Sequence, residues 1–409
     1  MHAETPPTQR TILHLDLDAF FCAVEELRDP SLRGKAFAVG GSPDGRGVVA
    51  TCSYAARRFG IHSAMPTARA LRLCPELILV RHHFRDYTDL SRRVMDLLQG
   101  YSDLVQPISI DEAFVDVSHL PQPGVVYAKQ LQTQIRDHLH LPSSLGVASN
   151  KLVAKVATNV GKASMKTGNY PFAIQVVPHG EEAAFLAPLP SEALWGIGPK
   201  TAERLAALGM HTVGDIARYP LHEMVRLLGQ TGSALHFRAQ GIDDSPVHVS
   251  HETKSVSHEE TFAKDTNNED ELMLVIAEQA KSIAKHLRKL KLHCSTVAIK
   301  IRWPDFSKIS RQLTLPEPTD EAKLIEEAAR TLFQAHWKPG RKIRLLGVRA
   351  SNLTAPSFQP KLWDWDPKAF AKQEKLDAAL KTLEERFGAN SLVPASGLRG
   401  SRGKKGQQE

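Results

Sequence analysis

The feature that most constrains the fold is a change in secondary-structure pattern near residue 176. Between residues 11 and 175, helical patterns alternate with strand-like segments: ILHLDLDAFF, KAFAVGG, GVVAT, ELILV, DEAFVDV and SLGVAS. Residues 180 to 240 instead contain short amphipathic helices separated by Gly-containing turns. A chain of 409 residues is too long for one hydrophobic core. We therefore predict an α+β protein of roughly two to four structural units, one of them helical.

The second half of the chain predicts another small unit. Residues 241 to 260 are polar and rich in turn formers, as in a linker. A helix from Glu269 to Leu290, strands in STVAIKIRW and KISRQLTL, a second helix and a strand in RKIRLLGVRASNL then make an α+β domain. The tail has one more helical pattern, EKLDAALKTLEERFG, and a Gly-, Lys- and Arg-rich end that predicts disorder.

Composition excludes several classes of protein. No apolar run is long enough to cross a bilayer and the N-terminal residues lack a secretory signal, so we expect a cytoplasmic protein without membrane contact. Cys22, Cys52, Cys74 and Cys294 show no paired spacing, and we interpret them as buried small hydrophobic side chains rather than as disulfides or a zinc site. The net charge of +7 weakly favours a polyanionic partner.

Two acidic segments suggest a metal site. In HLDLDAFF the leucines alternate with polar residues, so a strand places Asp16 and Asp18 on one face. Such hard oxygen ligands suit Mg²⁺, although a solvated acidic edge strand is the commoner explanation of an isolated D-x-D. In SIDEAFVDV, Asp111 and Glu112 interrupt an apolar strand pattern. A regular strand aims them at opposite faces, so a shared site needs a turn or bulge there. If Asp16, Asp111 and Glu112 converge, they can hold two divalent cations for nucleotidyl transfer.

Four segments, HLDLDAFFCAVEE, SYAARRFGIHSAMP, SIDEAFVDV and NKLVAKVAT, resemble in this order the signature segments of Y-family (translesion) DNA polymerases, and most closely the DinB or DNA polymerase IV group. The resemblance implies a right-hand fold: a palm (11–18 and 87–175), fingers (19–86), a thumb (176–241), a linker (242–252), a little finger (253–355) and a tail (356–409). It also implies a monomer that performs low-fidelity synthesis on primer–template DNA from deoxynucleoside triphosphates, with two Mg²⁺ ions per active site and no proofreading exonuclease.

The same resemblance assigns roles to single residues. Asp16, Asp111 and Glu112 become the catalytic and metal-binding carboxylates, with the main-chain carbonyl of Leu17 as a further ligand, whereas Asp18 receives no role. Phe21 takes the steric-gate position, where its ring collides with a ribose 2′-hydroxyl and deoxynucleotides are selected. Phe20 lies beside it in the substrate pocket and also has the pattern of an ordinary core residue.

The incoming nucleotide is assigned to a second set of residues: Val48, Ala50, Thr51, Tyr54, Arg57 and Lys162. Tyr54 and Arg57 lie three apart at the start of a helical pattern, so both can face one ligand, and a helix N-terminus favours phosphate. The segment around Lys162 is atypical, because the family shows an acidic residue followed by K-P-x-G where this chain has Asn159 and GKASMKTG. Lys155 and Lys166 are nearby alternatives.

Three segments suggest macromolecular contacts. LWGIGPKTAERLAALGMHTVGDIA resembles a helix-hairpin-helix in which Gly196, Gly198 and Lys200 contact a DNA phosphate, the alternative being a simple packing corner. Basic residues alternate in the last domain and suggest a DNA-facing sheet surface, or merely a solvent face: Lys300, Arg302, Lys308 and Arg311. QPKLWDW resembles a degenerate sliding-clamp-binding peptide anchored by Gln359, Leu362 and Trp363, unless its tryptophans pack on the little finger.

Two rival classes explain only part of this pattern. A non-catalytic DNA-binding protein has no need of Asp16, Asp111 and Glu112. A nucleotide cyclase on a palm-like fold has no need of a thumb and a basic C-terminal domain.

Overall fold

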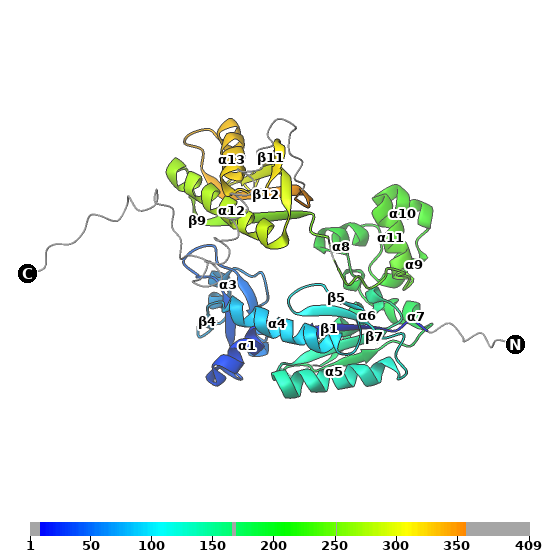
Figure 1. Cartoon of the computed structure of the whole chain (residues 1–409). Coiled ribbons are helices and arrows are strands. Elements are labelled where there is room, and N and C mark those ends of the chain that lie inside the picture. Colours follow the sequence, from blue (N-terminus) through cyan, green and yellow to red (C-terminus); the bar gives the residue numbers. More distant parts are fainter. Residues whose placement is uncertain (1–8, 166–168, 251, 357–409) are drawn as a thin grey trace, which may run out of the picture.

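The computed structural model describes residues 9–165, 169–250 and 252–356, which form three sheets with their covering helices (Figure 1). The first sheet has five strands in the order β5-β6-β1-β7-β8. They are β1 (Ile12–Leu17), β5 (Val105–Pro107), β6 (Glu112–Asp116), β7 (Ser143–Ala148) and β8 (Ile174–Val176). β1 is the central strand and is antiparallel to both of its neighbours.

Helices cover both faces of this sheet, and the two faces of its central strand β1 differ in chemistry: one is apolar and the other carries polar side chains. Leu13, Leu15 and Leu17 are buried in one core with residues of α4 (Phe84–Gln99) and α5 (Gly124–Leu139). The opposite face, which carries His14 and Asp16, contacts α6 (Lys151–Ser164). The period-two pattern of the sequence therefore separates an apolar core from a polar surface on one strand.

A three-stranded sheet in the order β3-β2-β4 adjoins the first. Its strands are β2 (Phe37–Gly40), β3 (Val49–Cys52) and β4 (Ile78–Val80), and its helical segments are α1 (Phe20–Arg28), the 3₁₀ helix η1 (Pro30–Leu32), α2 (Tyr54–Arg57) and α3 (Thr67–Leu73). Some apolar residues of this unit form a small core of their own, whereas those of α1 and η1, with Phe37 and Val39 of β2, belong to the core of the five-stranded sheet.

The predicted helical unit follows β8. Its segments are α7 (Glu182–Leu186), the 3₁₀ helix η2 (Ser191–Ala193), α8 (Pro199–Ala206), α9 (Val213–Arg218), α10 (Leu221–Leu228) and α11 (Gln230–Ala239). Its core is shared with α6 and with buried residues of β1, β6 and β7, so the helical unit is anchored on the five-stranded sheet.

The last unit is a four-stranded sheet in the order β11-β10-β12-β9 with two helices on one face (Figure 1). Its elements are β9 (Ser255–Thr266), α12 (Glu269–Leu290), β10 (His293–Arg302), β11 (Lys308–Thr319), α13 (Ala322–His336) and β12 (Ile343–Thr354). The expectation of a linker through residue 260 is wrong, because β9 begins at Ser255. β9 is an edge strand whose side chains are mostly exposed, so its sequence has the polar composition of a loop.

Polar contacts fix the last unit relative to the first two. The guanidinium of Arg46, in the loop between β2 and β3, donates to the carbonyl of Phe262 (2.9 Å) and to the carboxylate of Asp265 (2.6 Å). The segment that leads to β9 is held on the five-stranded unit, since Lys151 Nζ donates to the carbonyl of Pro246 at 2.8 Å.

The expectations for the N-terminal strands and for the cysteines are confirmed. Each of the six predicted N-terminal strand segments contains a strand, whereas the three-residue strands β5 and β8 were not predicted. The four cysteines are free and buried. In the described part of the chain, no helix is long and apolar enough to span a membrane.

Candidate active site

The site is built on the polar face of β1, where α6 approaches unusually closely. Gly146 on β7 is the register partner of His14, and a Cβ atom at Gly146 would lie 1.9 Å from the carbonyl oxygen of Ala154 and 2.7 Å from the amide nitrogen of Thr158. Only glycine allows this packing. The close approach brings the lysines of α6 within reach of the carboxylates.

The turn that the sequence required at the second acidic segment is present. β6 begins at Glu112, and the three residues before it bend away from the strand. The hydroxyl of Ser109 accepts hydrogen bonds from the amides of Asp111 (3.3 Å) and Glu112 (3.1 Å), and the carbonyl of Asp111 accepts one from the amide of Leu17. Glu112 is thereby the register partner of Asp16, and Asp111 reaches the end of β1.

Lys162 pairs with both aspartates of the D-x-D segment. Its Nζ lies 2.6 Å from Asp16 and 3.1 Å from Asp18. Burial raises the pKa of Asp16 to about 7, although Lys162 opposes this shift. Burial also acts to lower the pKa of Lys162, but the two carboxylates outweigh it and the pKa is raised. The atypical segment therefore still delivers its lysine to the carboxylates.

A second lysine of α6 holds the third carboxylate. Nζ of Lys155 donates to Glu112 at 2.7 Å and lies 3.4 Å from Nε2 of His14. Since an ammonium only donates, Nε2 is the acceptor and the protonated Nδ1 faces the hydroxyl of Thr158 at 2.8 Å. Burial lowers the pKa of His14 well below its ordinary value, which agrees with a neutral ring. The ammonium also lies 5.8 Å from the ring centre of Trp195, in the helical unit.

A cavity of about 220 Å³ lies between Asp16, Asp111 and Lys162 on one side and the three-stranded unit on the other. Its lining includes the following residues: Asp16, Leu17, Ala19, Phe20, Phe21, Ala50, Thr51, Arg57, Ser63, Asp111 and Lys162. Most of the residues assigned to metal, sugar and triphosphate thus surround one space. Glu112, which follows Asp111 in the chain, does not line the cavity, and neither does Val48, which is 49% exposed. Phe20 lines it and is otherwise a buried core residue.

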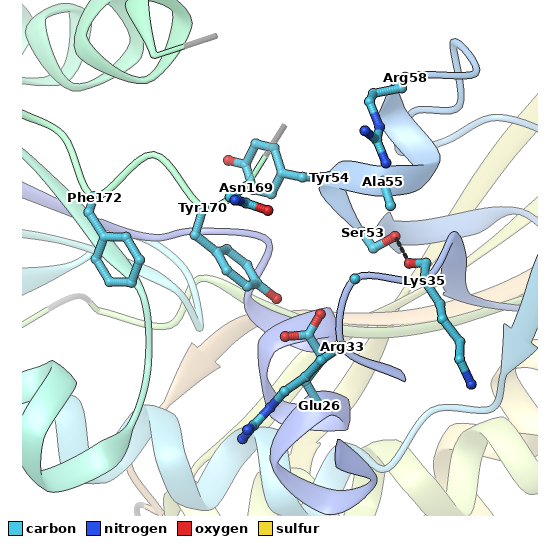
Figure 2. A pocket seen from close by; sticks show the side chains of 11 residues that line it. Glu26, Arg33, Lys35, Ser53, Tyr54, Ala55, Arg58, Asn169, Tyr170 and Phe172 are labelled. Carbon is cyan, nitrogen blue, oxygen red and sulfur yellow. Dashed lines mark hydrogen bonds between the residues drawn. The ribbon is translucent and has the colours of Figure 1, made fainter. Parts of the chain in front are cut away.

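Tyr54 and Arg57, both assigned to the incoming nucleotide, contact each other on α2. The helix α2 that carries them has only four residues, so it offers little dipole for a phosphate. Instead, the guanidinium of Arg57 stacks 4.4 Å above the ring of Tyr54. Arg57 lines the 220 Å³ cavity, whereas Tyr54 lines a neighbouring cavity of about 450 Å³. Figure 2 shows Tyr54, Tyr170 and Phe172 around this second cavity, with Glu26 beneath Tyr170.

The ring of Phe21 is supported from behind by a buried network. It stacks on Tyr87 with centroids 4.3 Å apart and planes 12° apart. The hydroxyl of Tyr87 donates to the carboxylate of Glu25, which also lies 2.9 Å from Nδ1 of His83. Burial and this carboxylate raise the pKa of Tyr87 well above its ordinary value. Glu25 lies in the signature segment HLDLDAFFCAVEE, whereas His83 and Tyr87 lie outside all four signature segments, and only the fold brings them to Phe21.

The donor set fits divalent cations, although the carboxylates are paired with lysines. Among the described residues, no three acidic, histidine or cysteine side chains stand close enough to enclose an ion. Asp16 and Glu112 are register partners on adjacent strands, and each contacts a lysine ammonium. Carboxylate oxygens are the hard ligand type that Mg²⁺ prefers.

The residues assigned to DNA occupy two separate places. Gly196 has a left-handed φ of 104°, and Gly198 is the N-cap of α8, so a tight turn leads into this helix and Lys200 lies in its first turn. In the last sheet, Lys300 is the partner of Ser310 and Arg302 that of Lys308, on the face opposite Ile299 and Ile301. The predicted place of Arg311 on that face is wrong, because Arg311 pairs with buried Ile299. Residues three apart in a strand point to opposite faces.

The proposed clamp-binding residues Gln359, Leu362 and Trp363 lie outside the described residues, as does Lys166. The helix and the disordered end that we predict for the tail lie there too.

Comparisons with known proteins agree with this architecture. A model of the impB/mucB/samB family matches residues 15–159, one of the C-terminal domain of that family matches residues 253–362, and one described as the DNA polymerase-iota thumb domain matches residues 192–243. DNA polymerase IV of Desulfatibacillum aliphaticivorans is 36% identical over 394 residues, which cover 95% of this chain and 97% of the relative. That of Halorhodospira halophila is 39% identical over 362 residues, covering 88% and 98%.

Solved structures show the same arrangement. A Y-family DNA polymerase chimera superposes with a TM-score of 0.72 at 25% identity, covering 85% of this chain and 100% of the chimera. An insertion ternary complex of Dbh DNA polymerase gives a TM-score of 0.61 at 26% identity with the same coverage. The fold is therefore a right-hand polymerase of the Y-family type. The chain belongs to the impB/mucB/samB family, so the family resemblance seen in its sequence is confirmed.

Proposed function

We propose that this protein is a DNA-directed DNA polymerase that extends a primer on a template, tolerates damaged template bases, and has no proofreading exonuclease. The observation that carries the proposal is the cavity in which Asp16, Asp111, Phe21, Arg57 and Lys162 meet in a chain of this family. In this proposal the five-stranded sheet is the palm, the three-stranded sheet belongs to the fingers, and the helical and last units are the thumb and little finger, with the boundaries expected from the sequence.

The carboxylates form the chemical centre of the proposal. Asp16, Asp111 and Glu112, with the carbonyl of Leu17, would hold two Mg²⁺ ions, which when bound promote attack by the primer 3′-hydroxyl and stabilise the leaving pyrophosphate. The turn at Ser109 supports this role, because it places Asp111 and Glu112 beside Asp16 rather than on opposite faces of a strand.

The remaining residues of the cavity select and orient the nucleotide. Arg57 has a forked guanidinium suited to two phosphate oxygens, and Lys162 supplies a point charge. The stacked ring of Phe21 leaves no room for a 2′-hydroxyl, since Tyr87 prevents it from moving back. Thr51 and Tyr54 complete the triphosphate contacts, and the small side chains of Val48 and Ala50 border the nascent base pair.

DNA is held by groups that read no sequence. Gly196, Gly198 and Lys200 would bind one phosphate in the thumb, and Lys300, Arg302 and Lys308 would contact the backbone from the little finger. Arg311 remains a candidate phosphate contact only from the edge of that sheet. The protein would act as a monomer, with Gln359, Leu362 and Trp363 binding a sliding clamp.

Primer extension on undamaged templates and on templates with defined lesions tests the proposal. We expect Mg²⁺-dependent incorporation of deoxynucleotides on both kinds of template. The absence of extension on an undamaged template would contradict the polymerase assignment, and excision of a mispaired 3′ nucleotide would contradict the lack of proofreading.

A further inference from the structure

Asp18 is a completely buried carboxylate to which the family resemblance gives no role. It follows β1 directly and is surrounded by donors: the hydroxyl of Ser144 at 3.0 and 2.9 Å from its two oxygens, the amide of Phe172 at 3.3 Å and Nζ of Lys162 at 3.1 Å. A carboxylate withdrawn from water is stable only where such donors replace its hydration. Asp18 is also absent from the lining of the 220 Å³ cavity, so it is an internal acceptor and not a ligand that faces the site.

Lys162 is shared between this internal carboxylate and one that faces the cavity. Its ammonium lies 2.6 Å from Asp16, which lines the cavity, and 3.1 Å from Asp18. When Asp16 binds a metal ion, its oxygens are no longer fully available to the lysine. Asp18 keeps all its contacts inside the protein and remains available.

We propose that Asp18 is a positioning residue, which holds the ammonium of Lys162 at the cavity so that it meets the incoming triphosphate after Asp16 has been engaged by metal. This inference rests on the proposed role of Lys162 as a triphosphate contact. A lysine has a long flexible stem and loses rotamer freedom when it binds a phosphate. A fixed acceptor directly after β1, opposite a lysine in the last turn of α6, restricts that freedom before the nucleotide arrives.

The geometry offers an almost isosteric test. In Asp18→Asn, the amide oxygen can take the place of the carboxylate oxygen that accepts from both Ser144 and Phe172. The amide nitrogen then replaces the oxygen that faces Lys162, and a donor cannot accept from an ammonium. The substitution therefore removes the contact with Lys162 and retains those that support the fold.

The experiment measures equilibrium binding of the correct deoxynucleoside triphosphate, with Mg²⁺, to the enzyme on a primer that ends in a dideoxynucleotide, so that no chemistry occurs. We expect the Kd to rise roughly tenfold for Asp18→Asn and at least as much for Lys162→Met, the range for a lost hydrogen bond to a charged group. The double variant should equal Lys162→Met within about twofold, because Asp18 acts through the lysine. Asp103→Asn, which neutralises an exposed carboxylate of the same unit, should leave the Kd unchanged.

The outcomes distinguish the proposed role of Lys162 as a triphosphate contact from the proposed role of Asp18 in positioning that lysine. A normal Kd for Lys162→Met refutes the triphosphate role of the lysine and the inference with it. A raised Kd for Lys162→Met with a normal Kd for Asp18→Asn keeps the triphosphate role of Lys162 but overturns the positioning role of Asp18. A further loss of affinity in the double variant, beyond that of Lys162→Met, also overturns the positioning role. If Asp18→Asn does not fold, a crystal structure of the wild-type ternary complex decides: Nζ of Lys162 within hydrogen-bond distance of Asp18 supports the inference, and separation of the two contradicts it.

Discussion

Removing the hydroxyl of Tyr87 should weaken the fold without opening the sugar gate. Tyr87 is fully buried, and its hydroxyl donates to Glu25, a carboxylate that is almost as inaccessible. A hydrogen bond to a charged group contributes about 1.5–3 kcal/mol. His83 and Arg28 still contact Glu25 in Tyr87→Phe, so we expect a loss of about 2 kcal/mol. Tyr87 and Glu25 lie in the part of the chain that contains the five-stranded and three-stranded sheets. For a domain of that size, a loss of about 2 kcal/mol lowers the midpoint of thermal unfolding by about 4–8 °C.

The ring that supports Phe21 is retained in this variant. Its stacking at 4.3 Å does not depend on the hydroxyl, so discrimination between deoxyribonucleotides and ribonucleotides should remain at the wild-type level. Calorimetry and single-nucleotide incorporation measure the two quantities, and Tyr87→Ala is the matched control that should impair both. The reasoning is refuted if Tyr87→Phe admits ribonucleotides as readily as Phe21→Ala does, or if its unfolding midpoint is unchanged.

Three further predictions follow from the site. Phe21→Ala should incorporate ribonucleotides, and unchanged sugar selectivity in a competition assay places the gate elsewhere. Gly146→Ala forces α6 away from β7 and should lower the free energy of unfolding, measured with a chemical denaturant, by about 1–3 kcal/mol. Gly198→Ala, with no atom within 4 Å of the new Cβ, should lower it far less, and equal losses argue against the close approach of α6. Because burial raises the pKa of Asp16 to about 7, this carboxyl is protonated below that pH in the metal-free protein. Divalent-ion binding should therefore release a proton and weaken about tenfold per pH unit as the pH falls below 7, which calorimetry in two buffers measures; pH-independent affinity contradicts it.

The sequence predicted the parts of the site that depend on local periodicity. Alternation along β1 placed Asp16 and Asp18 on one face, and Lys162 contacts both. The resemblance then placed Phe21, Arg57 and Lys162 at one site, and the structure brings them to one cavity.

Features that depend on tertiary contacts were not predictable. The turn before Glu112 depends on the hydroxyl of Ser109, a single side chain that leaves no pattern. The pairing of Lys155 with Glu112 requires the close approach of α6, which one glycine permits. The first residues of β9, up to residue 260, were predicted from composition as part of a linker, because an exposed edge strand can be as polar as a loop. Arg311 was predicted on the wrong face: it lies three residues after Lys308, and side chains in a strand alternate between faces with a period of two.

The central claim is that Asp111 and Glu112, turned beside Asp16, perform nucleotidyl transfer at the end of a primer. The most direct test compares wild-type protein with the double variant Asp111→Ala, Glu112→Ala in primer extension with Mg²⁺, alongside binding to the same primer–template DNA. We expect the variant to bind DNA with wild-type affinity and to add no nucleotide. Extension by the double variant at the wild-type rate would contradict the claim.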